Sequence, residues 1–368
     1  MVDYTARDLL GRSLHFSQRL LESVAANATP GVGVRHKFTG LDVLRGVAAL
    51  AVLLVHSNRL LDAEWLVPSG WLAVDLFFAM SGFVIAHSYD HKLESLGGMG
   101  FFRVRFIRLW PLFMLGVALG ALLALILLVR GGQNFGLSDV AVAIFCAALF
   151  IPAPMSALSQ GALSPLNTPG WSLILEIWIN CAFGFLHRRW SERVICAVAG
   201  FSALGIILFG VGGGHDIVHY FFRICFSFPL GVLIYRRREQ LPRLGVLKPV
   251  LLPAVALSFF VEPSLAYQKT FVLLLSPAFL VIGSQCEFDR RVAEYCAMAS
   301  YCVYAIHAPV LMLVGGFARS LGFSVVGITI FTIGALLVLP PYIDALYDRP
   351  MRLWLSQLKI RLPGMLRL

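Results

Sequence analysis

The chain has 368 residues, of which 58% are hydrophobic and only 14% are charged, and its mean hydropathy is +0.80. Soluble domains carry about 25% charged residues, so this composition excludes an ordinary soluble domain and indicates a polytopic membrane protein. The basic residues behind the formal net charge of +10 cluster in short connections and near both ends. They favour the lipid bilayer, with its anionic cytosolic leaflet, as the partner, and no nucleic acid.

Three regions follow one another along the chain. Residues 1–37 are expected to form a cytosolic lead-in with an amphipathic helix on the membrane surface. Residues 38–345 hold the apolar segments and are expected to form the transmembrane domain. Residues 346–368 are expected to form a basic cytosolic tail.

The transmembrane region contains eleven apolar segments. They are 40–58, 71–89, 109–129, 138–152, 171–187, 193–211, 217–235, 246–261, 269–285, 296–316 and 322–344. If all eleven cross, the basic clusters at 188–193 and 236–248 fall outside, whereas without 138–152 every basic cluster falls on one side. Segment 138–152 is also the shortest, with a length typical of a re-entrant or interfacial piece. We therefore expect an all-α membrane protein with about ten transmembrane helices around a central polar cavity and both termini cytosolic.

The first apolar segment carries Asp42, Arg45 and His56. Eleven residues are about three helical turns, so Arg45 and His56 project from one face, separated by a rise of about 16 Å. Asp42 lies one turn before Arg45 on nearly the same stripe. A single histidine near a helix end is more often structural, but a shared face with a buried arginine favours a polar cavity in which neutral His56 acts as a general base.

Asp75 lies inside the second segment, where Ser81-Gly82 favours close helix packing. Arg103, Arg105 and Arg108 lie just before the third segment. Arg105 and Arg108 share a face, which is typical of a phosphate clamp, but charges at this position equally serve to set topology.

Segment 168–180 places Ser172, Glu176 and Asn180 on one helix face. A buried carboxylate at Glu176 needs an arginine or histidine from a neighbouring helix, either as a structural ion pair or as a functional group.

Residues 299–310 place Ser300, Tyr304 and His307 on another stripe. Tyr301 suits a membrane-interface aromatic residue, whereas His307 lies too deep for that role. The seven cysteines show no CxxC or Cys/His spacing, so free thiols and no metal site are expected.

Together these residues give the chain a resemblance to the acyltransferase-3 family of integral membrane O-acyltransferases, over roughly residues 38–345. Five motifs of that family have similar segments here in the expected order. They are Arg45 and His56, then Ser81-Gly82-Phe83, then Arg105, Arg108 and Pro111, then Trp171-Ser172-Leu173 and Glu176, and then Ser300, Tyr301, Tyr304, His307 and Pro309. Some members continue into an SGNH hydrolase domain, and with its basic tail this chain is similar to the stand-alone form.

The resemblance implies a bacterial inner-membrane enzyme that transfers an acyl group, with acetyl expected, from cytosolic acyl-CoA to a hydroxyl. The acceptor would be a cell-envelope glycan, a lipid-linked saccharide or a secreted glycoside. Acetyl-CoA would be the donor substrate, and no permanently bound cofactor is expected.

The resemblance also suggests roles for individual residues. His56 would be the general base or a transient carrier of the acyl group, with Arg45 and Glu176 as further catalytic residues. Arg103, Arg105 and Arg108 would bind the donor. The remaining candidates for substrate binding are Asp42, Asp75, Trp171, Ser172, Tyr301, Tyr304 and His307.

Two other classes of protein stay open from the residues alone. A transporter or flippase for a glycan or lipid-linked precursor would use Arg45, His56 and Glu176 as a relay, although the sequence shows no inverted repeat. A non-catalytic scaffold would leave the buried ionisable groups unexplained.

Overall fold

The computed structural model describes residues 38–358 except 62, 64 and 213–216. The expected lead-in 1–37 and the last ten residues of the tail lie outside the described residues. Within the described part the chain is helical and has no strand, which confirms the all-α prediction. The helices are α2 (Thr39–Leu61), α3 (Ala73–Tyr89), α4 (Leu93–Arg130), α5 (Leu137–Ala148), α6 (Trp171–Phe185), α7 (Glu192–Phe209), α8 (Ile217–Arg237), α9 (Lys248–Ser258), α10 (Leu265–Thr270), α11 (Ser276–Ser284), α12 (Arg290–Ser320), α13 (Val325–Val338), α14 (Pro340–Ile343) and α15 (Arg349–Gln357).

Seven helical segments among the described residues are long and apolar enough to cross a membrane. They are Thr39–Asn58, Gly70–Tyr89, Leu93–Arg130, Glu192–Phe209, Ile217–Gln240, Leu265–Ser284 and Arg290–Ser320. An eighth is obtained if Val325–Val338 and Pro340–Gln357, which meet at a 54° bend, form one span. The chain is therefore a multi-pass membrane protein, while the count of ten and the side of the termini stay predictions.

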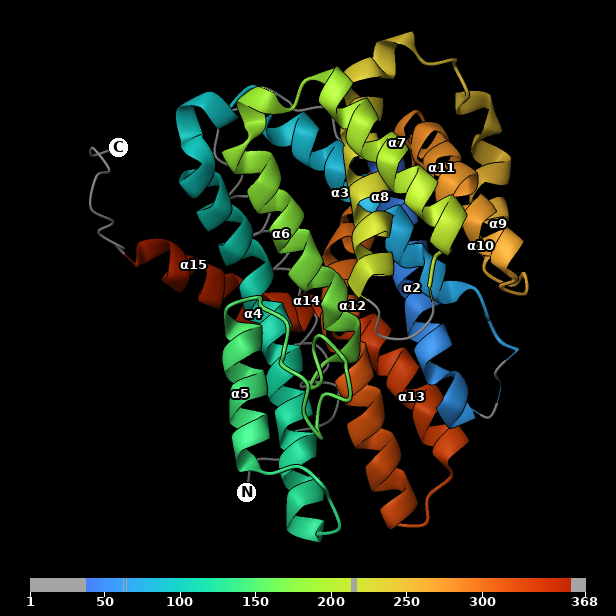
Figure 1. Ribbon diagram of the computed structural model, residues 1–368. Helices are drawn as coiled ribbons and strands as arrows, with labels where there is room; N and C mark the ends of the chain where they lie inside the picture. Colours follow the sequence, from blue (N-terminus) through green and yellow to red (C-terminus); the bar gives the residue numbers. More distant parts are fainter. Residues whose placement is uncertain (1–37, 62, 64, 213–216, 359–368) are drawn as a thin grey trace, which may run out of the picture. The chain divides into compact units, whose positions relative to one another are not determined.

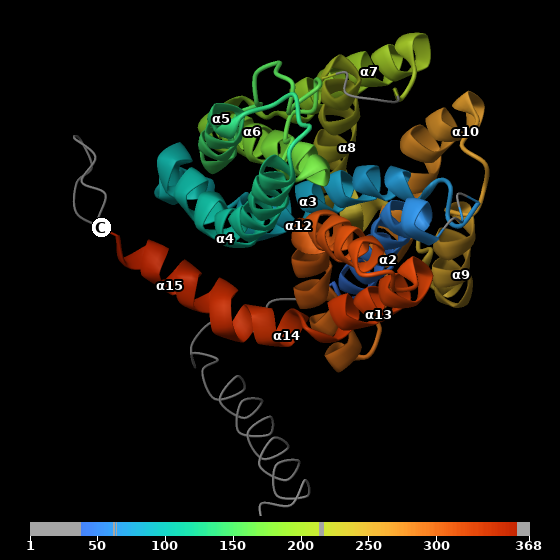
Figure 2. The ribbon, with the colours of Figure 1, turned by 90° about the horizontal axis from the view of Figure 1, so that it is seen from below.

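The helices in the other apolar segments are short. α6 has 15 residues and ends where Leu186 leaves helical geometry, and α9 has 11 residues. α5 has 12 residues, in keeping with the expectation that 138–152 is shorter than a span, and it lies alongside α4 (Figure 1). The C-terminal α15 packs against α4 and extends outward from the other helices (Figure 2).

Glycines bring α3 and α8 into close contact. A Cβ atom at Gly82 would lie 2.0 Å from the carbonyl oxygen of Phe228, and one at Gly231 would lie 2.0 Å from that of Ala79. Only a residue without a side chain fits at these two positions. The prediction that Ser81-Gly82 serves close helix packing is confirmed for Gly82, whereas Ser81 donates a hydrogen bond to Glu176. The approach also brings Asp75 on α3 against α8.

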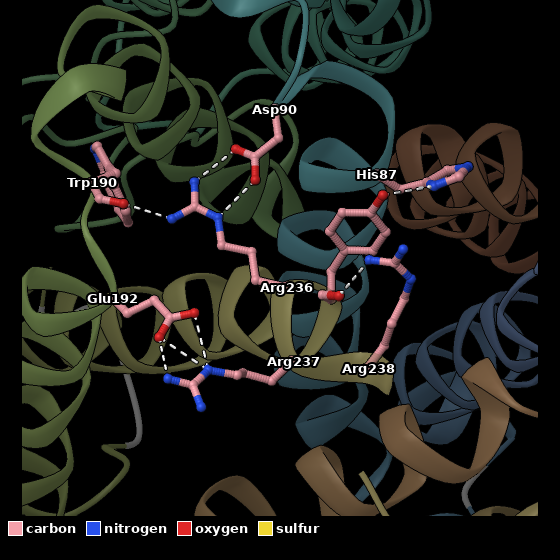
Figure 3. A network of polar contacts seen from close by, with 8 residues as sticks. His87, Asp90, Trp190, Glu192, Arg236, Arg237 and Arg238 are labelled. Atoms are coloured by element: carbon pink, nitrogen blue, oxygen red, sulfur yellow. Dashed lines mark hydrogen bonds and ion pairs between the residues drawn. The ribbon is translucent and has the colours of Figure 1, made fainter. Parts of the chain in front are cut away.

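A polar network ties together the ends of α3, α7 and α8 (Figure 3). Arg236 forms two hydrogen bonds of 2.7 Å with Asp90 and donates a third to the carbonyl oxygen of Trp190. Arg237 pairs with Glu192. These arginines of the 236–248 cluster are held by protein groups, which gives them a structural role.

Contacts at the start of α2 show which chain ends lie together. Thr39 accepts a hydrogen bond of 2.9 Å from the backbone of Phe288, just before α12, and Phe38 packs edge-on against His87 near the end of α3. The polar network lies at that same end of α3. The basic clusters around residues 188–193, 236–238 and 290–291 therefore share one end of the helix bundle, as the charge pattern predicted.

Candidate active site

Two cavities lie along α2. The first has a volume of about 280 Å³, is bounded by α2, α3, α4, α6 and α12, and is lined by Arg45, Arg105, Arg108 and Glu176; we call it the arginine cavity. The second has a volume of about 310 Å³ and is lined by His56, Trp71, Trp171, Tyr220 and Arg223; we call it the aromatic cavity. Val74 and Tyr304 line both, so the two cavities meet at these side chains.

Three helices converge on Glu176 in the arginine cavity. Its Oε1 atom accepts a hydrogen bond of 3.1 Å from Arg105 Nη2 on α4 and one of 2.8 Å from Ser81 Oγ on α3. A neighbouring helix thus supplies the expected arginine, although that partner is Arg105 and not Arg45 or His56. The buried Nε atom of Arg105 has no hydrogen-bond partner among the described residues, so this guanidinium retains a donor.

The other two arginines of this cavity are less fully neutralised. Arg45 Nη1 lies 3.5 Å from Asp42, one turn earlier on α2. The Arg108 guanidinium lies 5.7 Å from the centre of the Tyr301 ring, and no carboxylate of the described residues pairs with it. With three guanidinium groups and one carboxylate in its wall, the arginine cavity suits an anionic ligand.

Arg103 does not line the cavity. Two residues are about 200° around a helix, so Arg103 faces away from Arg105, and its Nη2 donates hydrogen bonds of 2.7 and 3.0 Å to the carbonyl oxygens of Ser356 and Leu358. These contacts fasten the end of α15 to α4. The position of Arg103 therefore gives no support to its expected role in binding the acyl-CoA donor.

Two histidine rings lie side by side next to the aromatic cavity. The His56 Nδ1 atom bonds to the carbonyl oxygen of Val52 at 2.8 Å; a neutral ring that donates there has Nε2 as its basic nitrogen. The His307 ring meets the His56 ring edge-on at 4.9 Å and is fully buried. Nδ1 of His307 bonds to backbone carbonyl groups one turn back, while its Nε2 has no partner in the described part of the chain.

Arg223 on α8 is a functional candidate that sequence reasoning missed. It forms hydrogen bonds of 3.1 and 2.6 Å with the two carboxylate oxygens of Asp75, and both side chains are at most 2% exposed. Its guanidinium lies 5.1 Å from the ring centre of Trp71 and 5.5 Å from that of Trp171. The signal was present, because an arginine within the apolar segment 217–235 is by default functional or paired.

Tyr304 is held firmly between the two cavities. Its hydroxyl group lies 2.6 Å from Ser172 Oγ and donates to the carbonyl oxygen of Pro169 at 3.1 Å, and its ring packs edge-on against Phe77. The structure thus brings α6 and α12 together at the junction through two of the predicted residues, Ser172 and Tyr304.

The remaining predicted residues lie close to these sites. Tyr301 lines the arginine cavity and bonds to the carbonyl oxygen of Leu109. Asp42 and Asp75 line neither cavity and pair with Arg45 and Arg223. Among the described residues no group of three or more His, Cys, Asp or Glu side chains could hold a metal ion.

Comparison with known proteins gives a family match over most of the chain. The model of the family described as Acyltransferase domain, acyltransferase-3, matches residues 38–341. A protein of Rhizobium radiobacter named Protein 2 in picA locus is 39% identical over 167 residues, which are 43% of this chain and 84% of that protein. The O-acetyltransferase OatA of Staphylococcus aureus (strain NCTC 8325 / PS 47) is 31% identical over 187 residues, which are 46% of this chain and 29% of OatA. No solved structure matches the chain.

Proposed function

The chain belongs to the acyltransferase-3 family, and from this membership and its two cavities we propose that it transfers an acyl group, with acetyl expected, from acyl-CoA to a hydroxyl of a saccharide. Membership makes the protein an acyltransferase. The donor, the acceptor, which would be a cell-envelope glycan, a lipid-linked saccharide or a secreted glycoside, and the roles below are our proposal. A transporter or flippase is not favoured, because the matched family is an enzyme family.

One observation carries the proposal: two cavities of different chemistry meet at Tyr304 and Val74. A transfer between two substrates that approach from opposite directions requires such a junction. The reacting groups can meet there without a free intermediate in lipid, and holding two reactants in place is itself a large part of catalysis.

The arginine cavity would receive the donor. Coenzyme A carries several phosphate charges, and both Arg105 and Arg108 line this cavity, where guanidinium groups favour an anion. The cavity is far smaller than the whole of coenzyme A, so only the acyl thioester end would enter it fully, and Arg105 and Arg108 would hold the phosphates at its mouth. We place the end of the bundle that holds the basic clusters on the cytosolic side of the bacterial inner membrane, because basic clusters favour that side.

The aromatic cavity would receive the acceptor hydroxyl. His56 Nε2 would take the hydroxyl proton as the acceptor oxygen bonds to the carbonyl carbon of the thioester, and the carbon–sulfur bond would then break. The leaving thiolate takes up a proton to give free coenzyme A. In the alternative route His56 first carries the acyl group itself. His307, edge-on to His56, would position the ring in both routes.

The test uses purified protein in nanodiscs supplied with acetyl-CoA and a mixture of saccharides. Release of free coenzyme A together with a saccharide ester, detected by mass spectrometry, is expected. Folded protein that neither binds acetyl-CoA nor releases coenzyme A would contradict the proposal. A saccharide that crosses a sealed bilayer without modification would point to a transporter instead.

A further inference from the structure

The aromatic cavity is lined by polar groups that the proposed reaction does not use: Arg223, which is paired with the buried Asp75, and two tryptophan side chains. We infer that these groups make the cavity a subsite for one uncharged, hydroxyl-bearing ring, with Trp71 and Trp171 as specificity-determining residues. This inference rests on the proposed function and narrows the class of acceptor.

The charge of Arg223 is already compensated. Both carboxylate oxygens of Asp75 accept hydrogen bonds from it, and the two side chains are almost completely buried. An anionic ligand would have to displace Asp75 or lie beside its carboxylate, and both arrangements are unfavourable where water is excluded. The cavity therefore selects against a negatively charged ring.

The tryptophans of the chain fall into distinct groups. Trp110, Trp178 and Trp190 each donate the indole N–H to a backbone carbonyl oxygen, at 3.0, 2.9 and 3.2 Å. Trp65 and Trp354 are exposed. Trp71 and Trp171 are only partly exposed, and their indole N–H groups have no hydrogen-bond partner among the described residues.

Neither indole N–H is among the buried polar atoms that lack a partner in the described part of the chain, so both are accessible to a ligand, and an indole N–H with one side in an apolar wall favours an acceptor. The two that lack one line the same cavity, next to His56 and Tyr304. The hydroxyl and ether oxygens of a sugar ring are acceptors of the required kind and carry no charge. They would satisfy both indoles while another hydroxyl of the same ring reaches His56.

The size of the cavity limits how much of the acceptor enters. About 310 Å³ lies at the lower end of the range for ligand pockets. One monosaccharide ring fits this space, and the rest of a longer glycan would remain outside. Recognition would therefore concern the ring that receives the acyl group.

The experiment compares two acceptors that differ in one carboxylate, phenyl β-D-glucopyranoside and phenyl β-D-glucuronide. Protein in nanodiscs is given acetyl-CoA and each acceptor in turn, and the acetylated glycoside and free coenzyme A are both measured. We expect at least tenfold more transfer to the glucopyranoside. In Trp71→Phe the KM for the glucopyranoside should rise about fivefold, the effect of one lost neutral hydrogen bond.

Trp178→Phe is the matched control, because it removes an indole N–H that already has a backbone partner. Its KM for the glucopyranoside should equal that of the wild type. Asp75→Asn leaves the Arg223 charge without its partner, so its preference should shift toward the glucuronide. If Asp75→Asn does not fold, the inference is tested by the preference of the wild type between the two acceptors and by the KM values of Trp71→Phe and Trp178→Phe.

Three results would overturn the inference: equal or better transfer to the glucuronide by the wild type, equal KM values for Trp71→Phe and Trp178→Phe, or acetyl-CoA turnover with no transfer to the glucopyranoside. In each of these cases acetyl-CoA is still turned over. Failure of the protein to turn over acetyl-CoA at all would instead contradict the proposed function.

Discussion

The arginine cavity and the aromatic cavity have similar volumes and share two wall residues, yet they differ in charge. Three guanidinium groups and one carboxylate line the first. The second holds a single guanidinium, and a buried carboxylate neutralises it. Both cavities contain arginine. The charge that each presents to a ligand therefore depends on whether its arginine is paired with a carboxylate, rather than on the presence of a basic residue alone.

The difference originates in helix packing. Gly82 and Gly231 let α3 and α8 approach closely, and that approach brings Asp75 within hydrogen-bonding distance of Arg223. Arg108 on α4 faces the Tyr301 ring and forms no direct ion pair with a carboxylate of the described residues. Arg223 is therefore a neutralised part of the aromatic cavity wall, whereas the charge of Arg108 is available to a ligand in the arginine cavity.

The largest effect is expected from His56→Ala, which removes the proposed base in the wall of the aromatic cavity. The turnover number for acetyl transfer should fall about 10²–10⁴-fold, the usual contribution of a positioned base. His187→Ala is the control, because His187 bonds to Gly184 at the end of α6 and lines neither cavity. A His56→Ala enzyme as fast as the control would remove His56 from the mechanism.

Asp75→Asn breaks the compensation that distinguishes the aromatic cavity. A buried charge that loses its partner costs about 3–5 kcal/mol, so the thermal unfolding temperature in nanodiscs should drop markedly. The double variant Asp75→Leu/Arg223→Met removes both charges and should recover most of the loss. An unchanged unfolding temperature in Asp75→Asn would show that Arg223 is not held by this carboxylate.

Arg108→Gln tests the available charge of the arginine cavity. The KM for acetyl-CoA should rise about tenfold, as expected for a lost hydrogen bond to a charged group, and the wild-type KM should rise with ionic strength. Arg103→Gln is the matched control on the same helix, because Arg103 binds the end of α15. If Arg103→Gln raised the KM as much as Arg108→Gln, both arginines would bind the donor.

The smallest effect is expected from Tyr304→Phe, which keeps the ring at the junction and removes the hydroxyl that bonds to Ser172 and to the carbonyl oxygen of Pro169; Ser172 still donates to that carbonyl, so the net loss is about one hydrogen bond. One neutral hydrogen bond is worth about 1 kcal/mol, so the turnover number should fall about fivefold. A loss beyond about a hundredfold would mean that the hydroxyl takes part in the chemistry, for example by polarising the thioester carbonyl. An unchanged turnover number would show that the tyrosine hydroxyl has no part in the reaction.

The sequence predicted much of the site, because helical periodicity is a local property. Arg45 and His56 were expected on one face, and they line two neighbouring cavities that both border α2. Glu176 was expected to find a partner on another helix, and it does. The same periodicity already separates Arg103 from Arg105, so the position of Arg103 was predictable too.

Pairing between helices was harder to predict. Asp75 and Arg223 are 148 residues apart, and no local pattern shows that their helices touch. The lengths of α6 and α9 were also overestimated, because hydropathy records an apolar segment and does not show where the helix within it ends. Both outcomes depend on tertiary packing.

The assignment of the two substrates to separate cavities is tested most directly by two KM values, one for acetyl-CoA and one for the glycoside acceptor. Both are measured in Arg108→Gln and in Trp71→Phe. Separate cavities predict a crossed pattern, in which Arg108→Gln raises mainly the KM for acetyl-CoA and Trp71→Phe raises mainly the KM for the acceptor. If each variant raised both values equally, or if the pattern were reversed, the assignment of the donor to the arginine cavity and of the acceptor to the aromatic cavity would be wrong.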